Sequence, residues 1–170
     1  KAERFFELYL THVKGEWASM PFKLERWQRE IVRTLFGWKR PDGTRRYRTC
    51  YIEIPRKNGK SSLCAGLALY LLMADREPSA EVYSAAADRE QASIIFDIAK
   101  SMVSVSNELN LRLKVFRKAI AYNKAMSSYK VLSADAYTKH GLNAHGIIFD
   151  ELHAQPNREL WDVLATSTGA

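Results

Sequence analysis

The spacing of apolar residues near the start of the chain predicts an amphipathic helix followed by a strand. Between residues 23 and 38 apolar side chains recur every three or four positions, as on the buried face of a helix. These positions are Leu24, Trp27, Ile31, Leu35 and Trp38. Residues 39–44 contain the turn-forming run Pro-Asp-Gly. Residues 47–54 then alternate and are rich in β-forming side chains, which predicts a strand that ends at Pro55.

The next segments predict buried elements. Residues 60–74 are apolar on nearly every side, so they predict a helix that is buried on most faces. Residues 81–87 predict a second buried strand, and Asp88 with Gln91 resembles a capping box that begins another helix. The inner face of that helix would consist of Ala92, Ile95, Phe96, Ala99, Met102 and Val103.

Strands and helices continue to alternate in the C-terminal half. Two strands are predicted at about 114–122 and 128–133, and residues 146–150 predict a short apolar strand that ends in an acid. Pro156 begins the last predicted helix, 156–166, because proline fits the first turn. This order argues for an α/β fold with a mainly parallel sheet and helices on both faces.

Length and composition are those of one soluble globular domain. The chain has 170 residues, of which 46% are hydrophobic and 26% charged. We expect an N-terminal helical segment, 1–44, and a sheet core, 45–170. Cys50 and Cys64 lie in apolar patterns without metal-ligand spacing, which indicates free core thiols in a reducing compartment. No stretch resembles a signal peptide or is long enough to span a bilayer, so we expect a cytosolic protein without a membrane partner.

The charge balance suits a polyanionic partner such as DNA. The formal net charge is +7, from 26 Lys and Arg against 19 Asp and Glu. Two groups of cations could contact DNA phosphates, which need positive charge but no special geometry. The first group is Lys39, Arg40, Arg45, Arg46 and Arg48, and the second is Arg112, Lys114, Arg117 and Lys118. A solvated surface is the alternative for each group. The histidines show no ligand spacing: His12, His140, His145 and His153.

Residues 54–62, Ile-Pro-Arg-Lys-Asn-Gly-Lys-Ser-Ser, have the context of a phosphate-binding loop, because they follow a predicted strand and open a predicted helix. The backbone N–H groups of such a loop wrap phosphate oxygens, and the helix directs its positive end at them. Gly59 permits the required backbone shape. Lys60 would reach the β- and γ-phosphates, and Ser61 would bind Mg²⁺. The general pattern asks for glycine at Ile54, so this is a deviant Walker A motif, and a basic turn containing Gly-Lys-Ser is the alternative.

The strand predicted at 146–150 would deliver two acids to the sheet edge where ligands of parallel sheets bind. Asp150 would hold Mg²⁺, and Glu151 would be the base that orients and deprotonates the attacking water. A pair of solvated acids after a core strand is the alternative. The two motifs complement each other, because one binds phosphate and the other binds metal and activates water.

Four segments together resemble the ATPase domain of tailed-bacteriophage terminase large subunits, the motors that package viral DNA. The segments are 24–28 (LERWQ), 54–61 (IPRKNGKS), 85–92 (AAADREQA) and 146–153 (GIIFDELH). The resemblance runs from about Phe22 to Ala170, and the missing first glycine is expected in one branch of that family. It implies a P-loop ATPase fold of the ASCE type, with ATP and Mg²⁺ as cofactors.

The resemblance also implies roles for single residues. Gln28 matches the glutamine that contacts adenine, and Arg56 matches the loop arginine that contacts the γ-phosphate. The implied nucleotide-binding set is Gln28, Arg56, Lys57, Asn58, Gly59, Lys60, Ser61 and Ser62. Lys60, Arg56 and Glu151 would be catalytic, while Ser61 and Asp150 would hold the metal. Without the resemblance, Gln28 would be interpreted as an exposed helix residue and Arg56 as a solvated cation.

Members of the family work as a homo-oligomeric ring on a portal protein, with a small terminase subunit as a further partner. They move double-stranded DNA into a procapsid in the host cytoplasm, and a neighbouring subunit supplies a cation to each ATP site. Arg89, Lys139 and His140 are the candidates here, with a solvated charge as the alternative for each. Full-length members continue through a coupling segment and a nuclease domain. We expect this chain to end before both and not to cut DNA.

Two other functions stay open from the sequence alone. One is another P-loop DNA motor, such as a helicase or a recombination ATPase, which would show further motifs and a second lobe. The other is a non-catalytic DNA-binding or assembly module with a vestigial ATP site. The intact Lys60, Asp150 and Glu151 favour an enzyme over this module.

Overall fold

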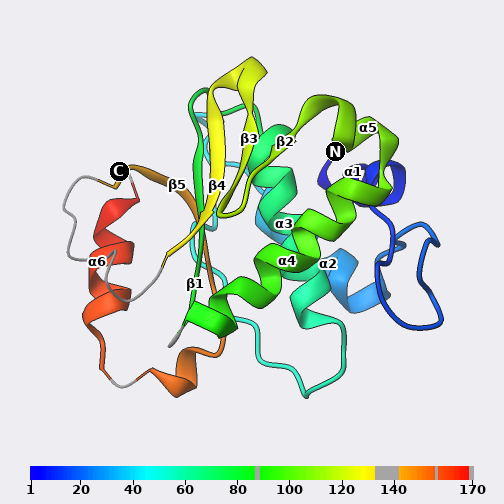
Figure 1. Cartoon of the computed structure of the whole chain (residues 1–170). Coiled ribbons are helices and arrows are strands. Elements are labelled where there is room, and N and C mark those ends of the chain that lie inside the picture. Colours follow the sequence, from blue (N-terminus) through cyan, green and yellow to red (C-terminus); the bar gives the residue numbers. More distant parts are fainter. Residues whose placement is uncertain (87–88, 133–141, 156, 169–170) are drawn as a thin grey trace.

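A central sheet lies between helices on both sides, as Figure 1 shows for the computed structural model. The structure describes residues 1–86, 89–132, 142–155 and 157–168. Its helices are α1 (Ala2–Tyr9), α2 (Arg26–Gly37), α3 (Lys60–Met73), α4 (Arg89–Val105), α5 (Asn107–Arg112) and α6 (Glu159–Ser167), with short 3-10 helices η1 (Asn123–Ala125) and η3 (Leu152–Ala154). Its strands are β1 (Glu81–Ala85), β2 (Lys114–Val115), β3 (Ala119–Tyr122), β4 (Ser127–Val131) and β5 (Ala144–Phe149). Within the described residues, no helix has the length and apolarity to cross a membrane.

The strands follow the order β2-β3-β4-β1-β5 across the sheet. β1 pairs in parallel with β4 on one side and with β5 on the other. β3 pairs antiparallel with β2 on one side and with β4 on the other, because short turns rather than helical crossovers connect these strands. The predicted parallel sheet is therefore confirmed for the part that carries β5, and the other edge is an antiparallel meander.

Different helices cover the two faces of the sheet. α3 and α4 pack together on one face, α1 contacts α2 and α3, and α6 lies on the other face beside β5 (Figure 1). The larger core, on the α3 side, contains the buried Leu69, Met102 and Tyr129. A smaller core under α6 joins Tyr83 to Leu160. The predicted inner face of α4 is confirmed, since all its apolar residues are buried: Ala92, Ile95, Phe96, Ala99, Met102 and Val103.

Two glycines allow α3 to lie close to its neighbours. A Cβ atom on Gly66 would lie 2.4 Å from Cε1 of Phe6, so only glycine lets α1 approach α3 this closely. A Cβ atom on Gly146 would lie 2.6 Å from Cδ1 of Leu71, which brings β5 against α3 in the same way. Protein interiors are packed too densely to absorb such overlaps freely. These two contacts therefore hold α3 against both α1 and β5.

The strand predicted at 47–54 is wrong, because these residues form neither helix nor strand. Tyr51 is 72% exposed, and Cys50, predicted as a core thiol, is exposed as well. Alternation supplies β-propensity, but a strand also needs a partner whose backbone groups pair with it. In the described chain β5 pairs with β1 and forms no ladder with this segment. Cys64 does lie in α3, where burial raises the pKa of its thiol to about 12.

Other element boundaries differ from the predictions for local reasons. The strand predicted at 114–122 is divided into β2 and β3, because the Phe116 N–H donates to the Ala119 carbonyl and reverses the chain. The predicted cap at Asp88 and the predicted helix start at Pro156 fall outside the described residues.

Candidate nucleotide-binding site

The loop before α3 has the geometry of a phosphate-binding loop. Gly59 precedes the helix with φ 72° and ψ 15°, a left-handed conformation that favours glycine. Lys57 also has a positive φ of 66°, which is uncommon for a residue with a side chain. The Asn58 side chain braces the turn by donating to the carbonyls of Pro55 and Arg56, each at 3.2 Å. The first amides of α3 lack intrahelical partners, as at every helix start, and so suit an anion.

β5 carries two acids to the same end of the sheet. The Asp150 N–H extends the pairing of β5 with β1 by donating to the Ala85 carbonyl at 2.9 Å, and Asp150 is buried. Glu151 adopts a left-handed conformation, with φ 48° and ψ 50°. A residue with a Cβ holds this conformation only where its surroundings impose it, and such residues cluster at functional sites. The Glu151 N–H donates to Oδ1 of Asp150 at 3.1 Å.

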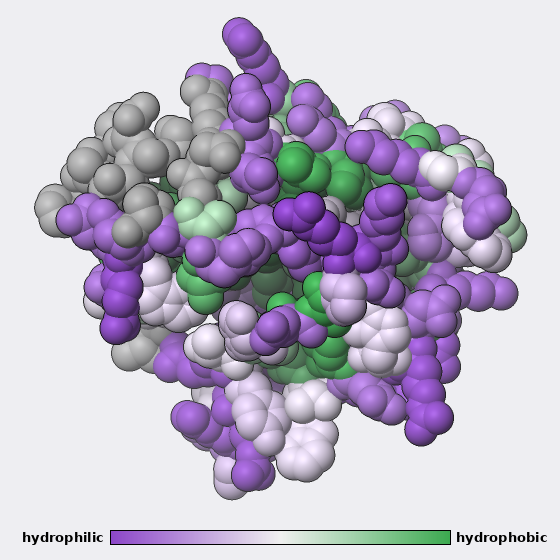
Figure 2. Space-filling model, turned by 90° about the horizontal axis from the view of Figure 1, so that it is seen from below, coloured by the Kyte–Doolittle hydropathy of each residue, from purple (hydrophilic) through white to green (hydrophobic). Residues whose placement is uncertain are grey.

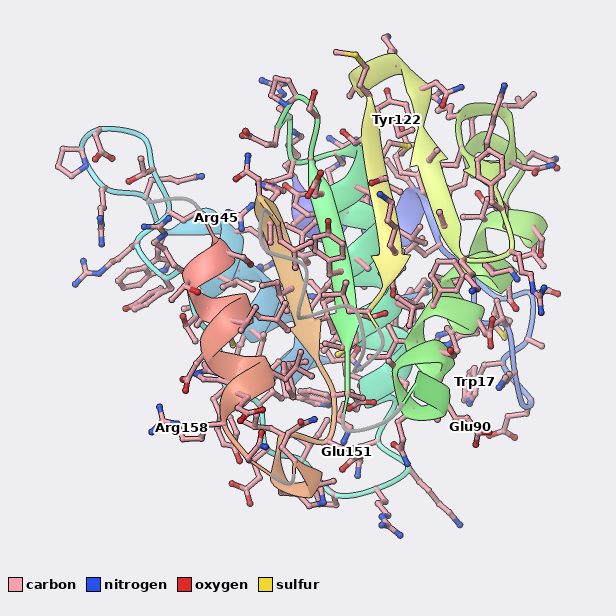
Figure 3. All side chains as sticks on the ribbon, turned by 60° about the vertical axis from the view of Figure 1, so that its left-hand side comes forward. Trp17, Arg45, Glu90, Tyr122, Glu151 and Arg158 are labelled. Carbon is pink, nitrogen blue, oxygen red and sulfur yellow. The ribbon has the colours of Figure 1, made fainter. Side chains whose placement is uncertain are left out.

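The phosphate loop and the acidic pair meet directly. Nζ of Lys60 lies 2.7 Å from Oε1 of Glu151 and 3.6 Å from Oδ1 of Asp150, although 91 positions separate Lys60 from Glu151. The hydrogen bond to Glu151 raises the pKa of Lys60, and the same bond lowers the pKa of Glu151. Both groups are therefore ionised at neutral pH. Figure 3 shows Glu151 at the end of the sheet where the loop enters α3.

A cavity of about 520 Å³ opens between these two motifs. This volume is in the range of small-ligand pockets. Its walls are Pro55, Arg56, Lys57, Gly59, Lys60, Ser61, Ser62, Gln91, Glu151, His153 and Ala154. Figure 2, which looks at this end of the molecule, shows a hollow with hydrophilic residues at its rim. Nearly all the residues expected to bind phosphate thus line one cavity.

Gln28 lies beside the phosphate loop rather than on an exposed helix face. It is buried, and its Nε2 is 3.7 Å from the position that a Cβ atom on Gly59 would occupy. Its Oε1 accepts from the Glu25 N–H at 3.0 Å, which closes a capping box at the start of α2. The solvent-exposed alternative for Gln28 is wrong, and the capping box explains why α2 begins at Arg26.

Two cavity residues had no assigned role in the sequence analysis. Gln91, seen there only as half of a capping box, lines the cavity from the first turn of α4. His153 lines it from η3, with Nδ1 3.4 Å from Oε2 of Glu151. The position of His153 three residues after Asp150 predicts that it lies near the end of the acidic strand without a catalytic role. For Gln91 there was no such signal, because its place depends on where α4 begins beside the loop. Of the candidates for a cation acting in trans, Arg89 begins α4, while Lys139 and His140 fall outside the described residues.

The chain matches the family model of the terminase large subunit, ATPase domain, over residues 26–170. It belongs to this family. The terminase large subunit of Enterobacteria phage HK97 is 29% identical over 171 residues, which cover 98% of this chain and 33% of that protein. The crystal structure of the HK97 bacteriophage large terminase superimposes with a TM-score of 0.82 at 27% identity, covering 98% of this chain and 34% of that one.

A more distant structure agrees on the fold. The large terminase ATPase domain of Thermus phage P74-26 has a TM-score of 0.61 at 20% identity, covering 86% of this chain and 62% of that one. The chain spans about a third of the length of its HK97 relative. Family membership makes it a P-loop ATPase domain that binds nucleotide, and the comparisons give no support to a helicase, a recombination ATPase or a non-catalytic module.

Proposed function

We propose that this domain hydrolyses ATP with Mg²⁺ to drive double-stranded DNA into a viral procapsid in the host cytoplasm. The observation that carries the proposal is the 2.7 Å contact between Lys60 and Glu151 at one cavity. A loop that binds phosphate and a carboxylate that activates water are the two parts that phosphoanhydride hydrolysis needs. The similarity to terminase large subunits supports the packaging role.

The positions of these side chains support the following reaction. The β- and γ-phosphates of ATP would lie against the amides of residues 56–61, and Lys60 would leave Glu151 to bind their oxygens. The freed Glu151 carboxylate takes a proton from a water, whose oxygen attacks the γ-phosphorus in line. The bond between the γ-phosphorus and the bridging oxygen breaks, and ADP leaves with the bonding electrons. Arg56, on the cavity wall, would stabilise the charge on the γ-phosphate.

Ser61 and Asp150 suit a magnesium ion, which prefers hard oxygen ligands and keeps several waters. Ser61 lines the cavity, and Oδ1 of the buried Asp150 lies 3.6 Å from Nζ of Lys60. Within the described residues no group of three or more His, Cys, Asp or Glu side chains could hold a metal. Phosphate oxygens and waters would complete the coordination. Mg²⁺ would neutralise charge that develops on the phosphates.

The remaining assignments extend the site beyond the phosphates. We propose that Gln28 contacts adenine, which its burial against Gly59 supports. We also propose that copies of the protein form a ring on a portal protein, with the small terminase subunit as a partner. A neighbour's cation, from Arg89, Lys139 or His140, would complete each site. These assembly roles rest on the similarity to whole terminase large subunits, of which the chain spans a third.

Substitution of Lys60 tests the proposed site. Lys60→Ala should abolish binding of ATP, because the loop loses the cation that contacts the β- and γ-phosphates. Lys130→Ala, which removes an exposed lysine of β4, is the matched control and should bind ATP as the parent does. Binding would be measured by calorimetry in the full-length protein with ATP and Mg²⁺. Unchanged ATP affinity in Lys60→Ala would refute the site.

A further inference from the structure

Residues 38–46 form a β-hairpin at the opposite end of β5 from the catalytic acids. Lys39 and Arg45 make an antiparallel bridge, and the Arg46 N–H donates to the Trp38 carbonyl at 3.0 Å. Asp42 closes the tip, where its Oδ1 accepts from the N–H and the hydroxyl of Thr44 at 2.8 and 2.7 Å. Figure 3 shows this loop projecting from the molecule near the label of Arg45, far from Glu151.

Arg45 is the anchor of this hairpin and does not contribute to its outer surface. Its guanidinium forms an ion pair with Asp75, and its Cζ lies 4.8 Å from the centre of the Phe36 ring. Oδ2 of Asp75 also lies 2.7 Å from Nε2 of His145 in β5. The side chains of Arg45 and Asp75 are only 22% and 12% exposed. One of the cations predicted as a DNA contact therefore has a structural role, and it ties the hairpin to the sheet.

The other cations of the hairpin and of the two residues that follow it are exposed: Lys39, Arg40, Arg46 and Arg48. Two aromatic rings are exposed among them, Trp38 at 53% and Tyr47 at 39%. Cζ of Arg46 lies over both rings, at 5.5 Å and 5.9 Å from their centres. Asp42 is the single acid in residues 38–48, and it is used at the turn. The hairpin thus presents a rigid, positively charged and partly aromatic surface.

We propose that this basic hairpin, together with residues 47 and 48, contacts the phosphodiester backbone of double-stranded nucleic acid. The inference rests on the proposed function, because it names the surface that meets the translocated polymer. Protein–protein interfaces are depleted of charge at their core, whereas nucleic-acid interfaces are polar and strongly positive. Exposed arginines bind phosphate without special geometry, and a planar guanidinium held over aromatic rings is pre-organised for it. An acidic protein surface is the rival partner.

The second basic group lies at the other edge of the sheet, on α5 and β2, and has a different character. Arg112 is paired with Glu108 at 2.6 Å. Leu111 and Phe116 are exposed beside it, at 83% and 55%. Because Glu108 partly neutralises Arg112, this edge suits a phosphate backbone less well than the hairpin does. This edge supplies a matched control, because the same number of charges can be removed there.

The test compares two double variants of the full-length protein. Arg40→Gln with Arg46→Gln neutralises the hairpin, and Lys114→Gln with Lys118→Gln is the control. Binding of a short random-sequence duplex is followed by fluorescence anisotropy over a series of salt concentrations. We expect several-fold weaker binding for the hairpin variant and a salt slope reduced by about two, because two phosphates are no longer neutralised. The control should keep the salt slope of the parent. The double variant Arg40→Lys with Arg46→Lys keeps both charges, so its salt slope should be close to that of the parent.

Three outcomes would overturn the inference. The first is a hairpin variant with the parent's affinity and slope, and the second is an equal loss of affinity in the control. The third is unchanged duplex binding together with weaker association with packaging proteins, which would assign the hairpin to an acidic protein surface. ATP turnover without DNA, measured in parallel, separates this inference from the proposed function. If the parent hydrolyses ATP but the hairpin variant binds duplex as the parent does, only this inference is refuted. If the parent binds no ATP, the proposed function is refuted.

Discussion

Replacing Glu151 by Gln should tighten the binding of a non-hydrolysable ATP analogue. Oε1 of Glu151 lies 2.7 Å from Nζ of Lys60, so a phosphate that binds Lys60 has to compete with this carboxylate. The side chains of Lys60 and Glu151 are 30% and 26% exposed, so solvent screens the attraction between them. The ion pair therefore contributes about 1 kcal/mol. Since about 1.4 kcal/mol is a factor of ten in an equilibrium constant, the Kd should fall about fivefold.

The same substitution should stop turnover, because a glutamine cannot accept the proton of the attacking water. Loss of a general base costs about 100-fold or more in rate. Affinity would be measured with a fluorescent analogue, and turnover by phosphate release. Glu108→Gln is the matched control, since Glu108 is also ion-paired, with Arg112 at 2.6 Å, but lies on α5 away from the cavity. An unchanged or raised Kd would refute the competition for Lys60, and turnover near the parent rate would refute Glu151 as the base.

Two further predictions concern stability. Gly66→Ala should lower the free energy of unfolding by about 1–3 kcal/mol in urea titrations, because the new Cβ overlaps the α1 side of the core. Gly37→Ala, where a Cβ meets nothing within 4 Å, is its control and should not destabilise, so equal losses would argue against the overlap. A hydrogen bond from Arg33 lowers the pKa of Glu3 below 4.5, so Glu3 stabilises the fold above that pH, and the benefit disappears as pH falls through the lowered pKa. Glu3→Gln should therefore lower Tm at neutral pH and not in strong acid, and a Tm difference that persisted in acid would contradict this ion pair.

Local pattern was enough to predict most helices and the place of the loop before α3. α3 is apolar all round, so most of its faces had to be buried, and α4 has a clear apolar face that had to pack on the core. The loop is defined by residues next to one another, and Gly59 takes the left-handed conformation that its position in the motif required. The acids at the end of β5 were predicted for the same reason, because a short apolar strand must end at the sheet edge.

Tertiary structure decided what depends on residues far apart along the chain. Residues 47–54 have the alternation of a strand, yet they form none, because pairing requires a partner backbone that no local pattern supplies. Arg45 belongs to a run of cations, but only the approach of Asp75 turns it into a partly buried anchor. In the same way, Gln28 lies beside Gly59 and His153 lines the cavity only because α2 and η3 lie near the loop in the folded chain. The hydrophobic period of a sequence indicates which side chains are buried. It does not indicate which residue each one contacts, because that contact depends on the packing of segments that are far apart in the chain.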